Sequence, residues 1–225
     1  MEEQRELDLG SAGASGRREY ERRRTKREQE VLERRPQIGR LLLKLQDTPQ
    51  HEQAWATGAT GEEMLAASLL KRCPDVPVLH DRRIPGSRAN IDHLAIAPSG
   101  VYVIDAKRYR GKVEVRRPIF GAEKLLIAGR DKTKLVETLK WQAETVQAAI
   151  DSLEEDAPVH ACLCFLNPKG QTGGTDIPVL RTLKVRGYPL YVPRKLAKRL
   201  NQPGELGPDR IQAMTEALAE RFPSA

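Results

Sequence analysis

The chain has 225 residues and a formal net charge of +7, from 38 Lys and Arg residues against 31 Asp and Glu residues. This length allows one good-sized α/β domain with an appendage and makes two full catalytic domains improbable. The excess of basic residues makes a polyanionic partner such as nucleic acid plausible.

The cysteines and the distribution of apolar residues indicate in which cellular compartment the protein is found. Cys73, Cys162 and Cys164 provide neither a disulfide framework nor the CxxC spacing of a zinc site. The amino terminus is acidic and polar, unlike a signal peptide, and no run of about 18 apolar residues occurs. We therefore expect a soluble, cytoplasmic protein with no membrane partner.

Residues 1–50 differ in composition from the rest and predict a charged helical extension that is partly flexible. Residues 10–16 are small and indicate a linker, and the charged run 17–35 favours an exposed helix. That helix is either a solvated helix, a basic arm against a phosphate backbone, or a surface that binds another protein. The leucines in 41–45 predict an apolar anchor for the helix on the main domain.

Residues 51–225 predict the main domain, with its core at about 58–166. A helix is expected from Thr60 to about Lys71, with Thr60 and Glu63 forming a capping box. Extended segments separated by turn-forming residues follow and predict a β-meander. These segments are 78–80, 90–97, 101–107 and 112–115.

The second half of the domain predicts a crossover and a helical close. A short strand at 125–128 precedes a long amphipathic helix at about 131–153. The apolar segment 159–166 then reads as a central strand buried on both faces of the sheet. Extended pieces at 183–185 and 190–192 precede two helices, the last running from Pro208, a favoured first-turn residue, to Phe222.

Two neighbouring strands place acidic residues within apolar sequence. Side chains alternate along a strand, so Asp105 and Lys107 share one face. The turn at 98–100 brings the strand of Asp92 beside the strand of Asp105, so that the two carboxylates could converge. His93 faces opposite to Asp92 and reads as a packed core histidine.

These residue types suit a hard divalent cation. Two carboxylates, a backbone carbonyl and waters are ligands that Mg²⁺ takes, and the ion would activate a water and stabilise charge on a phosphate. Lys107 could orient that water or neutralise the developing charge. An Asp-x-Lys triplet arises by chance on the order of once in a chain this long, so the triplet alone is weak evidence. Two acids within strands that should be buried are stronger evidence, because burying an unpaired charge is costly.

The motifs resemble the nuclease-related domain (NERD) family, a branch of the PD-(D/E)xK nuclease superfamily. The resemblance covers about 58–166. It rests on Gly61-Glu62 opening a helix, Ile91-Asp92-His93 in one strand, the run Gly100 to Lys107 in the next, Gly111-Lys112-Val113, Gly129-Arg130-Asp131 and Gln142.

The resemblance implies a restriction-endonuclease-like fold, a mixed central sheet flanked by helices, and a role in DNA processing. It implies that Asp92 and Asp105 bind Mg²⁺ or Mn²⁺, that Lys107 is catalytic, and that Glu62 and Gln142 assist. Many members carry Glu where this chain has the shorter Asp105. Without the resemblance, Glu62 can also be interpreted as a carboxylate that stabilises the start of a helix, and Gln142 as a surface residue.

Basic residues cluster just beyond Lys107 and are natural phosphate contacts, although they could equally be a solvated hairpin. They are Arg108, Arg110, Lys112, Arg116 and Arg117. The expected function is a metal-dependent nuclease that hydrolyses phosphodiester bonds in DNA. The alternative is a catalytically inactive module of the same fold that binds nucleic acid or another protein.

Overall fold

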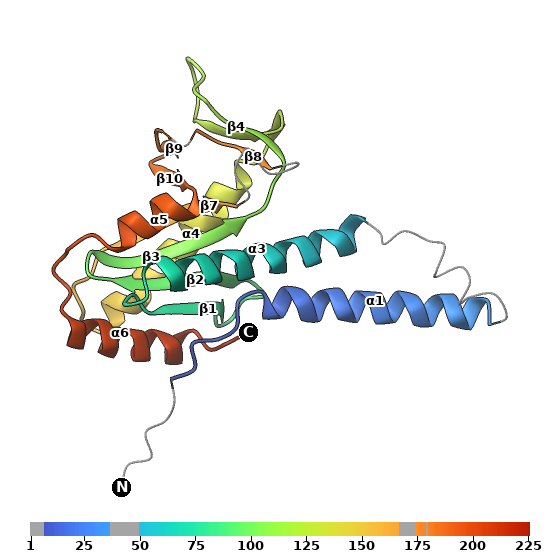
Figure 1. The fold of residues 1–225 in the computed structure, drawn as a ribbon, viewed down its shortest axis with the longest axis horizontal. Helices are drawn as coiled ribbons and strands as arrows, with labels where there is room; N and C mark the ends of the chain where they lie inside the picture. Colours follow the sequence, from blue (N-terminus) through green and yellow to red (C-terminus); the bar gives the residue numbers. More distant parts are fainter. Residues whose placement is uncertain (1–6, 37–49, 167–173, 179) are drawn as a thin grey trace, which may run out of the picture.

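The computed structural model describes residues 7–36, 50–166, 174–178 and 180–225. Within these ranges the chain is a mixed α/β structure with five helices and two mixed sheets (Figure 1). The helices are α1 (Ala14–Arg34), α3 (Gln50–Arg72), α4 (Lys134–Ser152), α5 (Pro193–Leu200) and α6 (Pro208–Arg221).

The larger sheet has the strand order β1-β2-β3-β7-β10-β9. Its strands are β1 (Val78–Arg83), β2 (Asn90–Ala97), β3 (Gly100–Lys107), β7 (Val159–Phe165), β9 (Leu183–Val185) and β10 (Tyr188–Tyr191). β1, β2 and β3 form an antiparallel meander, and β7 pairs parallel with both β3 and β10. The predicted meander, and the central strand reached by a crossover through α4, are confirmed here.

The segment after β3 leaves this sheet, so the prediction that it continues the meander is wrong. The smaller sheet has the order β6-β5-β4-β8, with strands β4 (Gly111–Arg116), β5 (Lys124–Ile127), β6 (Arg130–Asp131) and β8 (Thr175–Asp176). Gly111 begins β4 with φ +94°, and an added Cβ would lie 2.9 Å from the Cβ of Ala128. This left-handed, tightly packed glycine redirects the chain away from β3.

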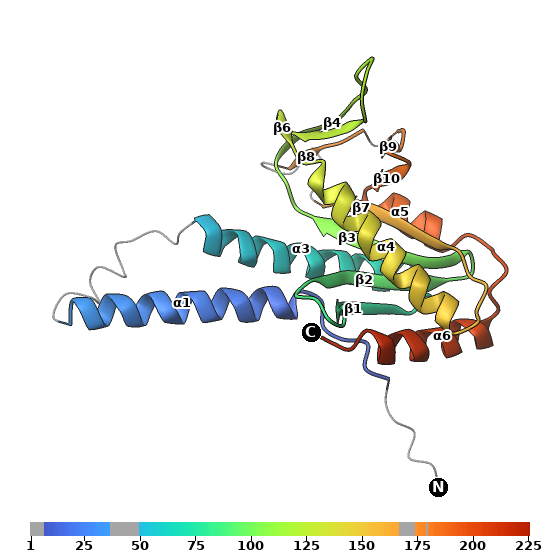
Figure 2. The same ribbon diagram turned by 180° about the vertical axis from the view of Figure 1, so that it is seen from behind.

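Helices cover both faces of the larger sheet. In Figure 2, α4 crosses one face, where it packs with α6 around a core that includes Val103, Val146 and Leu218. The other face carries α3 and α5, whose Leu69 and Leu196 belong to the same buried apolar cluster as Ile104. β3 therefore lies inside a helix–sheet–helix sandwich, which explains why its side chains are apolar on both faces.

α3 is longer than predicted and does not begin at Thr60. Its preceding part packs on α1, and the two helices run side by side away from the sheet (Figures 1 and 2). Gly16 is buried here, and a Cβ added to it would lie 3.3 Å from the Cβ of Ala59. Glu63 forms an ion pair with Arg17 (2.9 Å) rather than a capping box.

Residues 10–16 pack on the domain instead of forming a free linker. An added Cβ on Gly13, whose φ is +72°, would lie 2.7 Å from the carbonyl oxygen of Ala59. The predicted exposed helix 17–35 is present as α1. The predicted apolar anchor at 41–45 lies outside the described residues.

Both described ends of the chain cover the outer edge of β1. The amide of His80 donates to the carbonyl of Leu9 (2.7 Å), and the amide of Arg83 donates to that of Pro223 (2.8 Å). The buried Arg82 guanidinium donates to the carbonyls of Asp8, Ala219 and Phe222 and to the Ser224 hydroxyl. This edge therefore presents few unpaired backbone groups to other strands.

All three cysteines, Cys73, Cys162 and Cys164, are buried and unpaired in the structure. Across the described ranges, no helix combines the length and apolar character that crossing a bilayer requires.

Candidate functional site

The β2–β3 hairpin places the two aspartates across from each other. His93 pairs with Ile104, and the same register continued by one residue sets Asp92 opposite Asp105. Gly100 makes this short turn possible, because its φ of +125° is a backbone conformation that side chains disfavour. Local strand pairing thus delivers both carboxylates to one end of β3.

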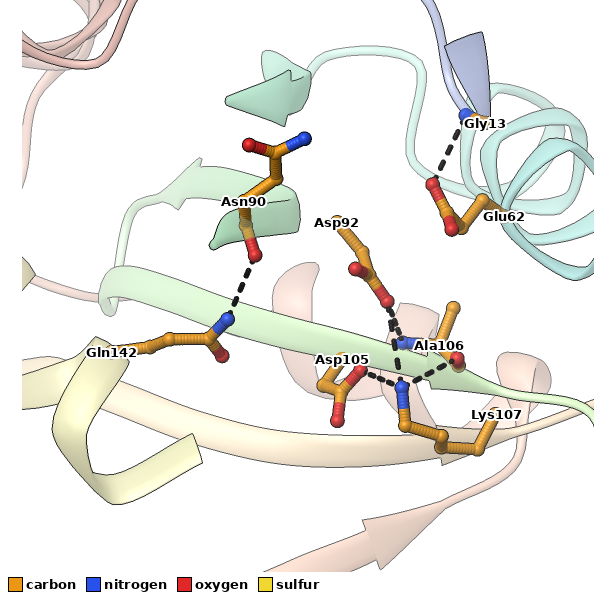
Figure 3. Close-up of polar contacts among 8 residues, drawn as sticks. All are labelled: Gly13, Glu62, Asn90, Asp92, Asp105, Ala106, Lys107 and Gln142. Atoms are coloured by element: carbon orange, nitrogen blue, oxygen red, sulfur yellow. Dashed lines mark hydrogen bonds and ion pairs between the residues drawn. The ribbon is translucent and has the colours of Figure 1, made fainter. Parts of the chain in front are cut away.

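The Lys107 ammonium lies between these carboxylates (Figure 3). It donates to Asp105 Oδ1, lies 3.8 Å from Asp92 Oδ2, and donates to the backbone carbonyl of Ala106 (3.2 Å). The Ala106 amide in turn donates to Asp92 Oδ2 (2.9 Å), which fixes that carboxylate. Three oxygens therefore surround one positive charge.

Burial and charge shift the pKa values of this cluster in opposite directions. Burial raises the pKa of Asp105 to about 7, helped by the charge on Asp92 and opposed by Lys107. The two carboxylates raise the pKa of Lys107 despite its burial, so the lysine stays cationic. The side chains of the three residues keep 10–20% exposure, so the cluster is accessible from solvent.

Glu62 lies on α3 beside this cluster, in the middle of the helix, so its interpretation as a helix-start carboxylate is wrong. Its Oε2 accepts a hydrogen bond from the Gly13 amide (3.0 Å). Burial, followed by the charges of Asp92 and Asp81, raises the pKa of Glu62 to about 9. At neutral pH this carboxyl group therefore carries a proton.

Asp81 is a further acid of the site that the sequence did not reveal. It is buried on β1, and its carboxylate accepts from the amide and hydroxyl of Ser15 (2.5 and 2.8 Å) and from the Asn90 amide group (3.0 Å). Its φ of +47° is unusual for a residue with a side chain. The acid in a strand sequence was the available signal, but its partner Ser15 lies 66 residues away.

Gln142 is buried, so its interpretation as a surface residue is wrong. Its amide nitrogen donates to the Asn90 carbonyl (2.8 Å), at the start of the strand that carries Asp92. Gln142 therefore ties α4 to β2, and it acts on the site by positioning that strand.

His93 lies in the core, as predicted from its strand face. It is fully buried, and its Nδ1 lies 2.8 Å from Nδ1 of His80 on β1. Burial lowers the pKa of His93 well below its usual value, so the ring is neutral. Within the described structure its Nε2 has no hydrogen-bond partner.

The five predicted phosphate-contacting residues follow Lys107 along the connection to β4 and beyond, and all are exposed. Arg108 lies next to α3, since a Cβ added to Gly61 would be 3.4 Å from its Cβ. Lys112 pairs with Glu114 (2.7 Å) and Arg117 with Glu123 (2.5 Å). The structure thus places Arg108 beside the helix of Glu62, Lys112 and Arg116 on β4, and Arg110 and Arg117 just before and just after that strand.

A cavity of about 840 Å³ opens beside Asp92 and Glu62, and neither Asp105 nor Lys107 is among its lining residues. The start of α1, the α3 segment around Glu62, and the β1–β2 region with Asp81 and Asp92 form its walls. It offers space next to the site for part of a substrate.

Fold and site together define a mixed α/β domain with two carboxylates and one lysine at the end of a strand hairpin. The family model described as nuclease-related domain matches residues 57–166, so over this range the chain belongs to that family. The matched range contains Glu62, Asp92, Asp105, Lys107 and Gln142. No curated protein and no solved structure matched the chain.

Proposed function

We propose that this protein is a Mg²⁺- or Mn²⁺-dependent nuclease that hydrolyses phosphodiester bonds in DNA, on a restriction-endonuclease-like core. The membership of residues 57–166 in the nuclease-related domain family supports a nuclease-related role. The observation that carries the proposal is the Lys107 ammonium, which is surrounded by oxygens of Asp92, Asp105 and Ala106.

This donor set fits a divalent cation. Carboxylate and carbonyl oxygens are the ligands that Mg²⁺ and Mn²⁺ take, and here they already hold a positive charge. Asp92 and Asp105 would hold the ion, with the Ala106 carbonyl as a third oxygen. The bound ion would act as a Lewis acid toward a phosphate oxygen and lower the pKa of a water molecule.

The protein's own residues have distinct tasks in this proposal. The raised pKa of Lys107 keeps a permanent positive charge at the site, which orients the attacking water and offsets charge on the phosphate. The protonated Glu62 reduces the negative charge that a phosphate meets on approach. Gln142 holds β2, and the exposed basic residues beyond Lys107 contact the DNA backbone.

A direct assay tests the proposal. Purified protein is incubated with plasmid, linear and single-stranded DNA in Mg²⁺, Mn²⁺ or EDTA, and the products are resolved on gels. We expect cleavage with either metal and none in EDTA, and Asp105→Asn and Lys107→Ala should each reduce the rate by about a hundredfold or more. Asp209→Asn and Lys198→Ala, at exposed positions on α6 and α5, serve as matched controls.

A second candidate is a module that binds nucleic acid without cleaving it. One observation favours it: in the described part of the chain, no group of three or more His, Cys, Asp or Glu side chains is arranged to hold a metal ion. It predicts salt-sensitive DNA binding that is indifferent to metal and to Lys107→Ala. Metal-dependent cleavage that is lost in Asp105→Asn would exclude it.

A further inference from the structure

The turn between β4 and β5 exposes two large apolar side chains. Ile119 is 94% exposed and Phe120 is 90% exposed, whereas the other two phenylalanines, Phe165 and Phe222, are buried. Both views show this hairpin projecting from the molecule beyond the end of the larger sheet (Figures 1 and 2). Adjacent apolar side chains at a projecting tip indicate a surface made for a partner.

Most of the chain's net charge lies in the segment that contains this tip. Residues 108–132 contain eight basic and three acidic residues, a net charge of +5, against +7 for all 225 residues. Arg116 on β4 pairs directly across from Lys124 on β5, and like charges at such positions destabilise a hairpin. Arg116 forms no ion pair with any residue that the structure describes, so its charge is available to an anionic partner.

The base of the hairpin is fixed in place. Glu123 pairs with Arg117 (2.5 Å) and accepts the Arg186 amide (2.7 Å), which joins the hairpin to the turn between β9 and β10. The Arg186 guanidinium also donates to the Glu123 carbonyl (3.0 Å). The tip is thus an apolar wedge on an anchored support.

We infer that Ile119 and Phe120 insert between the bases of duplex DNA while Arg116 contacts a flanking phosphate. Proteins that kink DNA use apolar wedges of this kind beside basic residues. The inference rests on the proposed nuclease function, because it identifies the substrate as a duplex that is locally unstacked near the cleavage site.

A fluorescent base analogue tests the wedge without cleavage. A duplex carrying 2-aminopurine is titrated with the full chain in EDTA, and both fluorescence and binding are followed. We expect fluorescence to rise with the wild type and not with the double variant Ile119→Ser/Phe120→Ser. The double variant should also bind about tenfold to a hundredfold more weakly, as when stacking contacts are lost.

Two further variants separate the contributions. Arg116→Ala should weaken binding and reduce the slope of the salt dependence by about one. Leu70→Ser, which alters another exposed apolar residue on α3, is the matched control and should behave as wild type. Unchanged fluorescence and binding in the double variant would overturn the inference.

Other partners give different results. If the double variant abolishes binding to phosphatidylserine vesicles but leaves the DNA signal intact, the tip serves a lipid surface and the inference is wrong. If light scattering shows a wild-type dimer that the double variant lacks, and DNA binding is unaffected, the tip binds a second copy of the chain and the inference is also wrong. Unstacking without cleavage in Mg²⁺ supports the wedge and contradicts the nuclease, whereas cleavage without unstacking does the reverse.

Discussion

Asp92 and Asp105 hold the Lys107 ammonium at the end of β3, and the carboxyl groups of Glu62 and Asp81 lie nearby on α3 and β1. Burial raises the pKa of Glu62 and of Asp105, which shows that their charged forms are disfavoured in the folded protein. Apolar residues would stabilise this position better than such a cluster does. Unfavourable charge of this kind is typical of sites that bind a cation or perform chemistry.

Asp105→Asn should stabilise the metal-free protein while removing its response to metal. At pH 8, above its pKa of about 7, Asp105 is ionised although it is buried and lies beside Asp92, and a neutral amide relieves the cost of burying that charge. We expect the melting temperature in EDTA to rise by roughly 2–4 °C, equivalent to about 1 kcal/mol. Adding Mg²⁺ should raise the melting temperature of the wild type but not that of the variant.

Differential scanning fluorimetry in EDTA and in Mg²⁺ measures both effects. Asp75→Asn provides the control, because it removes an exposed carboxylate from a turn rather than from a helix end. A variant that melts below wild type in EDTA would show that Asp105 stabilises the fold through Lys107.

The metal-free protein should lose stability as the pH rises from about 6 to about 9. Folding raises the pKa of Asp105 from 3.8 to about 7 and that of Glu62 from 4.5 to about 9. Between the unfolded and the folded pKa of each group, the folded state binds more protons than the unfolded state. The free energy of unfolding therefore falls with increasing pH. Glu62→Gln should flatten the decline above about pH 7, where Glu62 is the group still losing its proton.

Melting curves across this pH range, in EDTA, provide the measurement. A wild-type melting temperature that climbs over the same interval would contradict the assigned directions of these pKa shifts.

Between elements, the contact of α1 with α3 places the Gly13 amide on Glu62. Gly13→Ala should disrupt this contact, because φ is +72° and the new Cβ would meet the backbone of Ala59. We expect a loss of about 1–3 kcal/mol in the free energy of unfolding and faster proteolysis of α1. Gly58→Ala is the matched control, since no atom lies within 4 Å of an added Cβ.

Denaturant melts and limited trypsin digestion follow the two variants. Gly58→Ala should be neutral or stabilising, because alanine favours helices over glycine by about 1 kcal/mol. Equal proteolysis of wild type and Gly13→Ala would show that the start of α1 does not depend on this close approach.

The elements predictable from the sequence are those with local signals. Strand β2 was predicted with its observed bounds, and β3 within one residue, because apolar sequence is interrupted there by clear turn residues. The last helix was predicted within one residue because Pro208 marks its first turn. The same local alternation put Asp105 and Lys107 on one face.

The features that the sequence missed depend on contacts distant along the chain. The first part of α3 has small residues and little apolar periodicity, and it is helical where it packs on α1. Asp81 became recognisable only through its bonds to Ser15, and the burial of Gln142 through its bond to Asn90. The move of β4 into a second sheet likewise follows from pairing with β8, about sixty residues later.

For the molecule as a whole, Arg82 joins three distant parts of the chain. Its guanidinium binds the residues before α1 as well as the end of α6. Arg82→Ala leaves several buried carbonyls without a donor and should cost on the order of 3 kcal/mol. We expect a melting temperature lower by roughly 6–12 °C, measured by calorimetry.

Arg82→Lys should recover only part of this loss, because one ammonium cannot reproduce the planar arrangement of guanidinium donors. Arg83→Ala, which removes the exposed neighbouring arginine, is the control. A melting temperature for Arg82→Ala within about 1 °C of wild type would show that water replaces these bonds at little cost.

The outer edge of β1 is shared by segments that lie more than two hundred residues apart in the chain. Detachment of either segment exposes the same strand, so opening at one end should weaken the other. In native-state hydrogen exchange, the amides of His80, Arg83 and Ala225 should therefore report a common opening free energy, as members of one cooperative unit.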